Sequence, residues 1–460
     1  MKDLTKGPVG AHVLQLATFI ALTTTFQTLY FLADLYFVGR LGKEAIAGVG
    51  LAGNLMFLVL ALTQSLGVGA TSLIAQAMGR KDPARAELVF NQALVLSNLT
   101  GLAFGAVVFA LRGAYTRWLA ADATTAALGA QYLDWFVPAL SLQFVLVAMG
   151  AALRGIGDMK IPTLIQVVTV VLNILLAPTL MFGWITGRPL GVTGAALASF
   201  LAIAVGCLAF TAYFRRKHSP LRFRSADWAP RPRLWGEMLR IGLPAGGEFA
   251  LMTVYMVLVY DMIRPFGAAA QAGFGIGIRV VQSLFLPTVA IAFAVAPVAG
   301  QNFGARLGDR VRQSFYAAAG MSAAVMVALT LLCRIAPAAM VGFFNSDPGV
   351  VAFGSEYLRI ISWNFVASGI VFVSSSVFQG MGNTIPPLLS SLLRLLLFAL
   401  PAYALSQKPS FQMRYVWYLS VAAVTVQLCL NLWLLHREFG RKLSFALEPS
   451  PERLAAATTS

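Results

Sequence analysis

Two nine-residue stretches with the same glycine pattern, GKEAIAGVG at residues 42–50 and GAAAQAGFG at residues 267–275, decide the architecture of this chain. They lie 225 positions apart, and further residues recur at that spacing: Gln76/Gln301, Gly79/Gly304, Arg85/Arg310, Tyr132/Tyr357, Gly155/Gly380 and Pro162/Pro387. Single glycine matches are common in a chain with 41 glycines, but one ungapped spacing across a whole half is not. The sequence therefore predicts an internal duplication.

Composition places the chain in a membrane. Of its 460 residues, 58% are apolar and 11% are charged, whereas a soluble domain carries about 25% charged residues. At about 20–25 residues per crossing, this composition supplies roughly a dozen transmembrane helices. The breaks between apolar runs predict twelve helices near 11–38, 45–74, 86–111, 128–152, 161–182, 191–214, 236–263, 269–298, 311–335, 350–378, 386–405 and 413–436. We therefore expect an all-α polytopic membrane protein.

The duplication assigns six of these helices to each half. Because six is an even number, both halves begin on the same side of the membrane, which is a parallel repeat. The longest polar interruption, RRKHSPLRFRSADWAPRPRLW, falls in the middle of the chain. We predict an N-terminal lobe at 1–214, a linker at 215–235, a C-terminal lobe at 236–440 and a tail at 441–460.

The net charge of +16 indicates orientation in the membrane and not a nucleic-acid partner. Lysine and arginine total 34 against 18 acids, and they lie in short breaks between apolar runs. If both termini are cytoplasmic, the cytoplasmic breaks hold 22 basic residues and the opposite breaks hold nine. Basic residues are enriched in short cytoplasmic loops, so we expect cytoplasmic termini and a lipid-bilayer location.

A polar stripe in the first predicted span is the principal candidate site. Thr23, Gln27, Tyr30 and Asp34 are spaced by four, three and four residues, which places them on one face of a helix. Such a face avoids lipid and looks into a cavity or onto other helices. A carboxylate within a span is a functional hypothesis; a hydrogen-bonded cluster between helices is the structural alternative.

Other polar residues within the spans are weaker candidates. Glu248 follows GLPAGG in the seventh predicted span, where it is a second ion or substrate carboxylate or an interfacial acid paired with Arg240. Asn173 and Ser199 could complete a site with Asp34, although such residues also simply bridge membrane helices. Arg394 has no acid near it in the sequence and therefore needs a partner from another helix, or snorkels.

Several kinds of chemistry have no signature in the sequence. There is no HExxH motif, no glycine-rich phosphate loop and no paired-cysteine metal spacing. We therefore expect neither an enzyme nor a cofactor. Transport would draw its energy from an ion gradient, in which each charge moved gains about 2.3 kcal/mol per 100 mV.

Four strings resemble the multidrug and toxic compound extrusion (MATE) transporters, and the DinF-like bacterial branch in particular. They are QTLYFLADLYFVGRLGKEAIAGVG at 27–50, AQAMGRKDPARAE at 75–87, LRGIGDMKIPTLI at 153–165 and FQGMGNTIPPLL at 378–389. The resemblance covers nearly the whole chain. It implies two six-helix lobes in a V shape around a central cavity, in a bacterial cytoplasmic membrane. It also implies export of small organic cations by H⁺ or Na⁺ antiport, and we expect a monomer.

The resemblance also implies roles for individual residues. Asp34 takes the position of the first-span acid that couples cations, with Gln27 and Tyr30 on the neighbouring polar positions. Asn173 matches the fifth-span asparagine, and Ser199 replaces a sixth-span hydroxyl. No metal site other than Na⁺ at Asp34 is implied.

Three departures from the family pattern bear on coupling. Ala177 replaces a second acid in the fifth span, which leaves fewer oxygen ligands for Na⁺ and favours H⁺. Phe19 stands near the place of the first-span proline, so bending of that helix at a proline is not expected. Glu248 lies about one turn earlier than the usual seventh-span glutamate, and the tenth span has no acid at its middle.

Two other functions are compatible with parts of this pattern. A lipid-linked precursor flippase of the same superfamily would share the fold, but it needs a cationic cavity, for which only Arg394 and Arg279 are available. A membrane-embedded transferase or a non-transport scaffold would need a larger soluble region. No break in the sequence exceeds about 20 residues.

Overall fold

The chain folds into helices throughout the part that the structure describes. The computed structural model describes residues 3–184, 187–216, 219–409 and 411–444, and it contains no strand within them. The expected tail at 441–460 lies outside the described residues from 445 onward. The elements are α1 (Val9–Gly39), α2 (Lys43–Gly79), α3 (Pro83–Leu119), α4 (Ala123–Gly155), α5 (Lys160–Met181), α6 (Gly191–Phe214), η1 (Ser225–Asp227), α7 (Pro232–Ile263), η2 (Arg264–Phe266), α8 (Ala268–Gly304), α9 (Gly308–Ile335), α10 (Pro337–Gly342), α11 (Pro348–Ile361), α12 (Asn364–Gly380), α13 (Ile385–Ser406) and α14 (Met413–Lys442).

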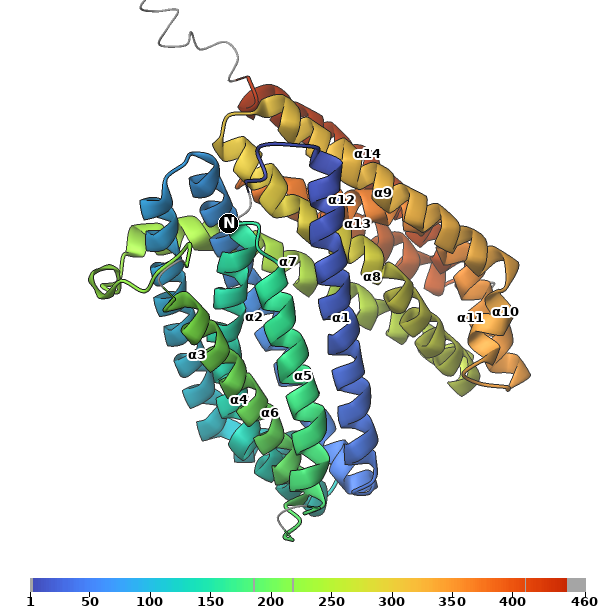
Figure 1. Cartoon of the computed structure of the whole chain (residues 1–460). Coiled ribbons are helices and arrows are strands. Elements are labelled where there is room, and N and C mark those ends of the chain that lie inside the picture. The colour runs from blue at the N-terminus through green and yellow to red at the C-terminus, as the bar shows by residue number, and fades with distance from the viewer. Residues whose placement is uncertain (1–2, 185–186, 217–218, 410, 445–460) are drawn as a thin grey trace, which may run out of the picture. The chain divides into compact units, whose positions relative to one another are not determined.

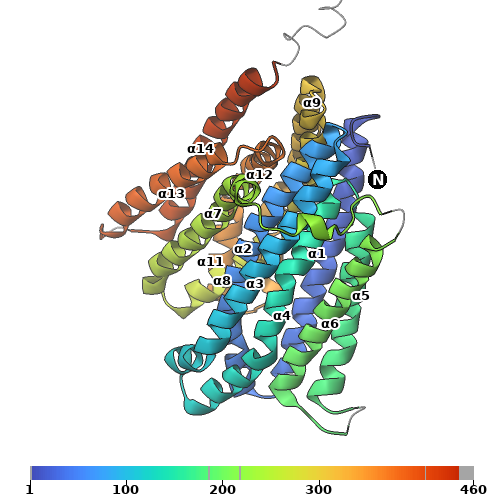
Figure 2. The same ribbon diagram turned by 90° about the vertical axis from the view of Figure 1, so that its left-hand side faces the viewer.

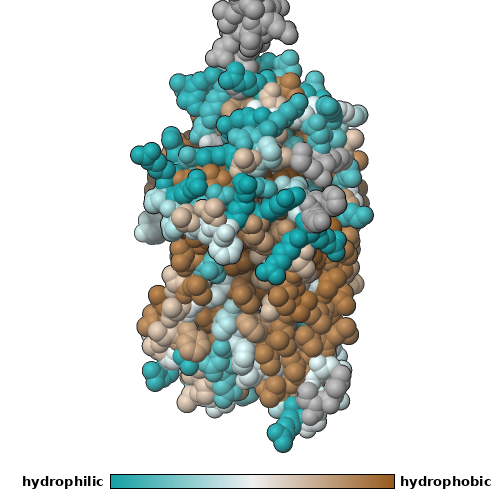
Figure 3. Space-filling model, turned by 60° about the vertical axis from the view of Figure 1, so that its left-hand side comes forward, coloured by the Kyte–Doolittle hydropathy of each residue, from teal (hydrophilic) through white to brown (hydrophobic). Residues whose placement is uncertain are grey.

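The helices are long and apolar enough to cross a membrane. Eleven of the described helices pass this test, and the bent pair α11–α12 makes a twelfth span if it is counted as one. Large apolar side chains such as Leu208 and Leu102 are more than half exposed. On the face shown in Figure 3, hydrophobic residues form a broad zone, and hydrophilic residues gather at one end. This pattern confirms the predicted all-α polytopic membrane fold.

The chain forms two compact units. Unit 1 contains Thr18–Met78 and Asp82–Gly246, and unit 2 contains Asp3–Ala17, Gly79–Lys81 and Gly247–Ser460. In unit 1, α4 packs against both α3 and α6, and α5 lies beside α6 in both ribbon views (Figures 1 and 2). In unit 2, α8 packs against α9, α11 and α12, while α13 lies beside α14. Helices α1 and α7 each begin in one unit and end in the other.

The internal duplication is visible in the helix bounds. Helix α2 spans Lys43–Gly79 and α8 spans Ala268–Gly304, so both of their bounds differ by 225. Helices α5 and α13 differ by the same number at both ends. The 225-residue spacing in the sequence therefore reflects a repeated three-dimensional unit.

Close backbone contacts at paired glycines also repeat. A Cβ built on Gly48 would lie 2.9 Å from the nitrogen of Gly129, and one built on its counterpart Gly273 would lie 3.0 Å from the nitrogen of Gly354. Gly129 and Gly354 are themselves 225 residues apart. Small residues allow membrane helices to approach this closely, so each repeat needs glycine at this crossing.

The second repeat differs from the first at one break. The sequence predicts one span at 350–378, but the structure divides it into α11 and α12, which are bent by 56°. The backbone carbonyl of Ser362, at the break, accepts a 3.0 Å hydrogen bond from the hydroxyl of Thr330. A side chain of α9 thus adds a second bond to this carbonyl, which also accepts from the backbone nitrogen of Phe365 at 3.1 Å. In the first repeat, α4 runs unbroken through Pro138, the counterpart of Trp363.

An aromatic cluster positions α14 in unit 2. The fully buried Trp417 stacks on Phe274 of α8 with ring centroids 5.6 Å apart, and it meets Tyr357 of α11 edge to face at 4.8 Å. Such contacts combine large apolar area with a preferred ring geometry. They hold α14 against α8 and α11, and they fix the depth of the polar residues that follow Trp417.

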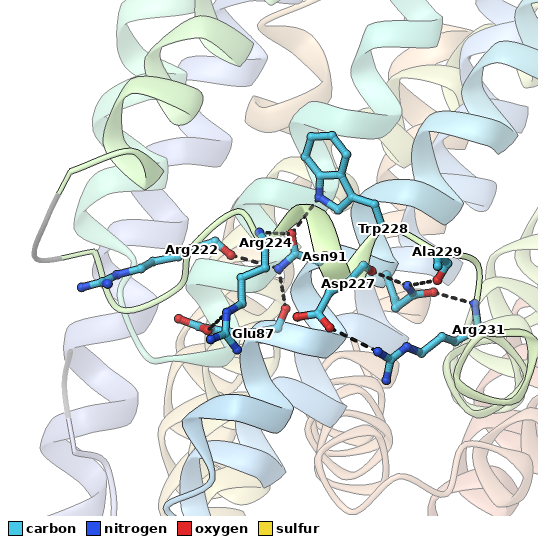
Figure 4. A network of polar contacts seen from close by, with 9 residues as sticks. Glu87, Asn91, Arg222, Arg224, Asp227, Trp228, Ala229 and Arg231 are labelled. Atoms are coloured by element: carbon cyan, nitrogen blue, oxygen red, sulfur yellow. Dashed lines mark hydrogen bonds and ion pairs between the residues drawn. The ribbon is translucent and has the colours of Figure 1, made fainter.

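The linker between the repeats is docked on α3 (Figure 4). The amide of Asn91 donates to the carbonyl of Arg222, and its oxygen accepts from the backbone nitrogen of Arg224 and from the indole nitrogen of Trp228, all at 2.9–3.1 Å. The neighbouring Gln92 bonds the linker backbone in the same manner at Asp227, Ala229 and Arg231. Two buried amides therefore pair linker groups that no regular element satisfies.

Replacing Gly48 with alanine should lower the unfolding temperature of the purified protein in detergent, because the new Cβ would meet the backbone of Gly129. Gly50→Ala is the matched control: nothing lies within 4 Å of the added Cβ, and the change should be neutral or stabilise by up to about 1 kcal/mol. Thermal unfolding curves compare the two variants. Unfolding of Gly48→Ala at the wild-type temperature would contradict the close crossing.

Replacing Asn91 with alanine should destabilise unit 1 by about 1–3 kcal/mol, because buried linker groups lose their partners. Asn98→Ala, an exposed asparagine on the same helix, is the control and should change stability much less. Unfolding temperatures in detergent measure both effects. Equal midpoints for these two variants would show that the linker contacts do not stabilise the fold.

Candidate functional site

The polar stripe of the first span lies on a continuous helix. Helix α1 extends over 31 residues without a break, so Thr23, Gln27, Tyr30 and Asp34 share one face. All four side chains are partly buried. The amide of Gln27 makes no hydrogen bond to any described residue, whereas Thr23 and Tyr30 both reach other helices.

Three of the predicted residues meet at one hydroxyl group. The hydroxyl of Tyr30 on α1 and Oγ of Ser199 on α6 are 3.0 Å apart. Nδ2 of Asn173 on α5 donates to the same Oγ at 3.2 Å. Asn173 and Ser199 are buried. The structure thus brings together residues from three helices that the sequence separates by up to 169 positions, while their role in transport stays a prediction.

Asp34 lies one turn beyond Tyr30 and has no counter-ion. Its Oδ1 atom is buried and has no hydrogen-bond partner among the described residues. The side chains that interact electrostatically with it are the phenols of Tyr30 and Tyr132. A buried carboxylate with a free oxygen is costly unless it binds a proton or a cation, so Asp34 remains the candidate ion-binding group of the stripe.

Tyr132 belongs to the site but was not a candidate from the sequence. It is 3% exposed and lies on α4. Its only signal in the sequence is its match to Tyr357 in the second repeat, which indicates a shared packing position and not a binding role. Only the packing of α4 within unit 1 places its phenol near Asp34.

The place of the missing proline is occupied by a hydrogen-bonded contact. The carbonyl oxygen of Phe19 accepts from the hydroxyls of Thr23 at 2.9 Å and of Thr163, on α5, at 3.1 Å. The two hydroxyls are 2.9 Å from each other. Helix α1 is therefore joined to α5 at Phe19, near the position of the family's proline.

Ala177, at the position of the family's second acid, provides no ligand for a cation. Ala177 is 1% exposed and packs in the apolar core of unit 1. No group of three or more histidine, cysteine, aspartate or glutamate side chains that could hold a metal ion occurs within the described ranges. Asp34 is therefore the carboxylate that α1 contributes to the inside of unit 1.

Glu248 occupies a separate position in unit 2. Its Oε1 atom is buried without a hydrogen-bond partner in the described part of the chain, as is Oγ of Ser375 on α12, which faces it. Arg240 is exposed and forms no ion pair with Glu248. Helix α7 continues through Pro244. Pairing with Arg240, the interfacial alternative, does not occur in this structure.

Unit 2 contains a second tyrosine–serine–asparagine contact, which the sequence did not reveal. The hydroxyl of Tyr255, the counterpart of Tyr30, is 3.0 Å from Oγ of Ser420, which also accepts from Nδ2 of Asn364 at 3.3 Å. The asparagine comes from α12 here and from α5 in unit 1. This difference explains why a comparison of the two halves position by position does not find it.

These features define a class of protein. The described residues form up to twelve apolar helices, arranged as two repeats. A few polar side chains lie inside the spans. This combination is typical of a polytopic membrane transporter and not of an enzyme. Residues 20–179 and 244–404 match the family described as MatE, once in each half. The chain belongs to this family of membrane transporters.

Known proteins resemble the chain over almost its full length. It is 26% identical to "Probable multidrug resistance protein YoeA" of Bacillus subtilis, covering 89% of this chain and 90% of that protein. It is 23% identical to a protein of Shewanella oneidensis named "FAD transporter", covering 88% of this chain and 90% of the relative. The outward-facing structure of a multidrug resistance MATE family transporter superposes with a TM-score of 0.87 at 23% identity, over 97% of this chain and 98% of that one.

Ser199→Ala removes the hydroxyl shared by Tyr30 and Asn173, and it should destabilise the protein by about 0.6–1.7 kcal/mol, the range for hydrogen bonds between membrane helices. Ser283→Ala, which removes an exposed hydroxyl bonded to its own helix, is the control. Thermal unfolding in detergent measures both. A larger loss for Ser283→Ala than for Ser199→Ala would contradict the bridging role of Ser199.

Proposed function

We propose that the protein is a secondary antiporter that exports organic, drug-like cations and is coupled to an inward flow of H⁺, with Na⁺ as the alternative ion. Membership of the MatE family and the name of the Bacillus subtilis relative support export of drug-like compounds. The observation that carries the coupling proposal is the buried, unpartnered carboxylate oxygen of Asp34.

The proposed cycle runs through Asp34. A cation from outside binds its carboxylate, which removes the cost of a buried charge without a counter-ion. The contacts of Tyr30 with Ser199 and of Thr23 with Thr163 connect this stripe to α5 and α6. A change of charge on α1 therefore alters its contacts with α5 and α6. In the proposed cycle, this rearrangement releases the bound substrate.

The oxygen count near Asp34 favours a proton over sodium. A hard metal cation needs several oxygen ligands, and the position of the second acid is the buried Ala177. Among the described residues, the side chains that interact electrostatically with Asp34 are the phenols of Tyr30 and Tyr132. A proton needs only the one carboxylate oxygen.

We further propose a bacterial cytoplasmic membrane location with both termini in the cytoplasm, and a monomer as the transport unit. The distribution of 22 basic residues against nine supports this orientation. Glu248 is a second candidate for ion binding, because its Oε1 and Oγ of Ser375 are both buried without partners. No enzyme activity or cofactor is part of the proposal.

Asp34→Asn should reduce proton-driven uptake of ethidium into inside-out vesicles at least tenfold, because the amide cannot take up the coupling ion. Asp261→Asn is the matched control: this aspartate also lies in a membrane helix, but it is exposed and forms no ion pair. Fluorescence quenching measures the rates after membrane insertion has been equalised by immunoblot. A wild-type rate in Asp34→Asn would refute the role of Asp34.

The coupling ion can be identified by replacing Na⁺ with choline at fixed pH in the same vesicles. We expect an unchanged ethidium rate and collapse of transport by a protonophore, because one carboxylate suffices for a proton. Dependence on Na⁺ would overturn the proton proposal. If Glu248→Gln then retains the wild-type response to the protonophore, Glu248 is not a coupling group.

A further inference from the structure

Unit 2 contains a partly buried arginine inside a membrane span. Arg394 is the tenth of the 22 residues of α13 and therefore lies near the middle of a membrane span. Nη1 makes one long hydrogen bond, of 3.5 Å, to Oε1 of Gln427 on α14. No carboxylate forms an ion pair with this guanidinium among the residues that the structure describes, and a charge at this depth is costly and rarely without function.

The groups around Arg394 orient its guanidinium without neutralising it. The ring of Tyr255 lies 5.1 Å from its Cζ atom. The amide of Gln427 donates to Oγ of Ser391, one turn before Arg394, at 3.1 Å, and Gln427 is 2% exposed. Of the five N–H donors of the guanidinium, one thus has a weak partner, and the others have none in the described residues.

The nearest acid on the adjoining helix is too far away to act as the counter-ion. Glu248 precedes Tyr255 by seven residues on α7, which is about 10 Å along a helix at 1.5 Å per residue. Its carboxylate faces Ser375 on α12. The positive charge of Arg394 therefore remains available to a ligand.

The second intramembrane arginine of this unit does not share these properties. Arg279 on α8 is exposed, and its guanidinium contacts no aromatic ring or amide in the part of the chain that the structure describes. It can extend along the helix surface towards water, as arginine does near a membrane boundary. The two arginines that the sequence could not distinguish are thus separated by their burial and by their neighbours.

We infer that Arg394 anchors an anion-binding subsite in unit 2, which receives the carboxylate of an aromatic compound that the transporter carries. A planar guanidinium with free donors matches a carboxylate in a two-bond geometry. The ring of Tyr255, packed on the buried Phe398 with centroids 4.6 Å apart, supplies an aromatic surface beside it. The inference rests on the proposed transport function and extends its substrates to compounds that carry an acidic group.

The experiment uses the full chain in nanodiscs and a matched pair of probes, 2-naphthoate and its neutral amide, 2-naphthamide. Wild-type protein should be stabilised against heat by naphthoate in a saturable manner, and at least tenfold less potently by naphthamide. Arg394→Gln should weaken naphthoate at least tenfold, while Arg279→Gln should bind it like the wild type. Equal affinity for naphthoate in wild type and Arg394→Gln would overturn the subsite, as would equal affinities for the two probes.

Two further arms keep the test decisive. If Arg394→Gln does not fold, Arg394→Lys replaces it: the lysine keeps the charge but loses the two-bond geometry, so naphthoate should bind several-fold more weakly, and unchanged binding would refute the subsite. Inorganic phosphate should compete poorly with naphthoate, and competition at equal concentration would show a general anion site and overturn the aromatic carboxylate assignment.

The binding test is independent of ethidium transport. If ethidium is transported but naphthoate does not bind, the subsite is wrong and the antiport proposal stands. If naphthoate binding depends on Arg394 but ethidium is not transported, the proposal for organic cations is wrong and the subsite stands.

Discussion

The structure depends on one constraint, the absence of water inside a bilayer. Every backbone donor and acceptor within a span must then be paired by the protein itself, which leaves helices as the spanning element. Side chains of neighbouring helices add bonds to some of these backbone groups. The hydroxyl of Thr330 bonds the carbonyl of Ser362 at the break before α12, and the hydroxyl of Thr163 bonds the carbonyl of Phe19 in α1.

The two repeats share a backbone frame but carry different charges. Close glycine crossings recur at the same spacing, because packing geometry tolerates few alternatives. The charged candidate residues inside the spans do not recur: the pairs at a spacing of 225 are Asp34/Val259, Thr23/Glu248 and Thr169/Arg394. A duplicated scaffold has therefore been given an acidic group in unit 1 and both an acid and a base in unit 2. In the proposed function, this difference in charge lets the two units bind different ions and ligand groups.

The sequence predicted the features that repeat or alternate over long stretches. The apolar runs predicted the spans, and the duplication predicted that α2 and α8 would match end to end. The span expected at 350–378 is a pair of helices bent by 56° at a break between Ile361 and Asn364, which the length and apolar character of this stretch did not indicate. The contact between Tyr255, Ser420 and Asn364 was also missed, since its asparagine comes from a different helix than in unit 1.

The sequence by itself determined the membrane class, the duplicated helical architecture and the place of a carboxylate, Asp34, inside a span, because these follow from composition and spacing. Tertiary structure decided which polar groups are paired. It joined Tyr30 to Ser199, left Asp34 and Glu248 each with an oxygen that has no partner among the described residues, and distinguished the partly buried Arg394 from the exposed Arg279. Pairing depends on side chains from helices far apart in the chain, and no local pattern encodes their distance.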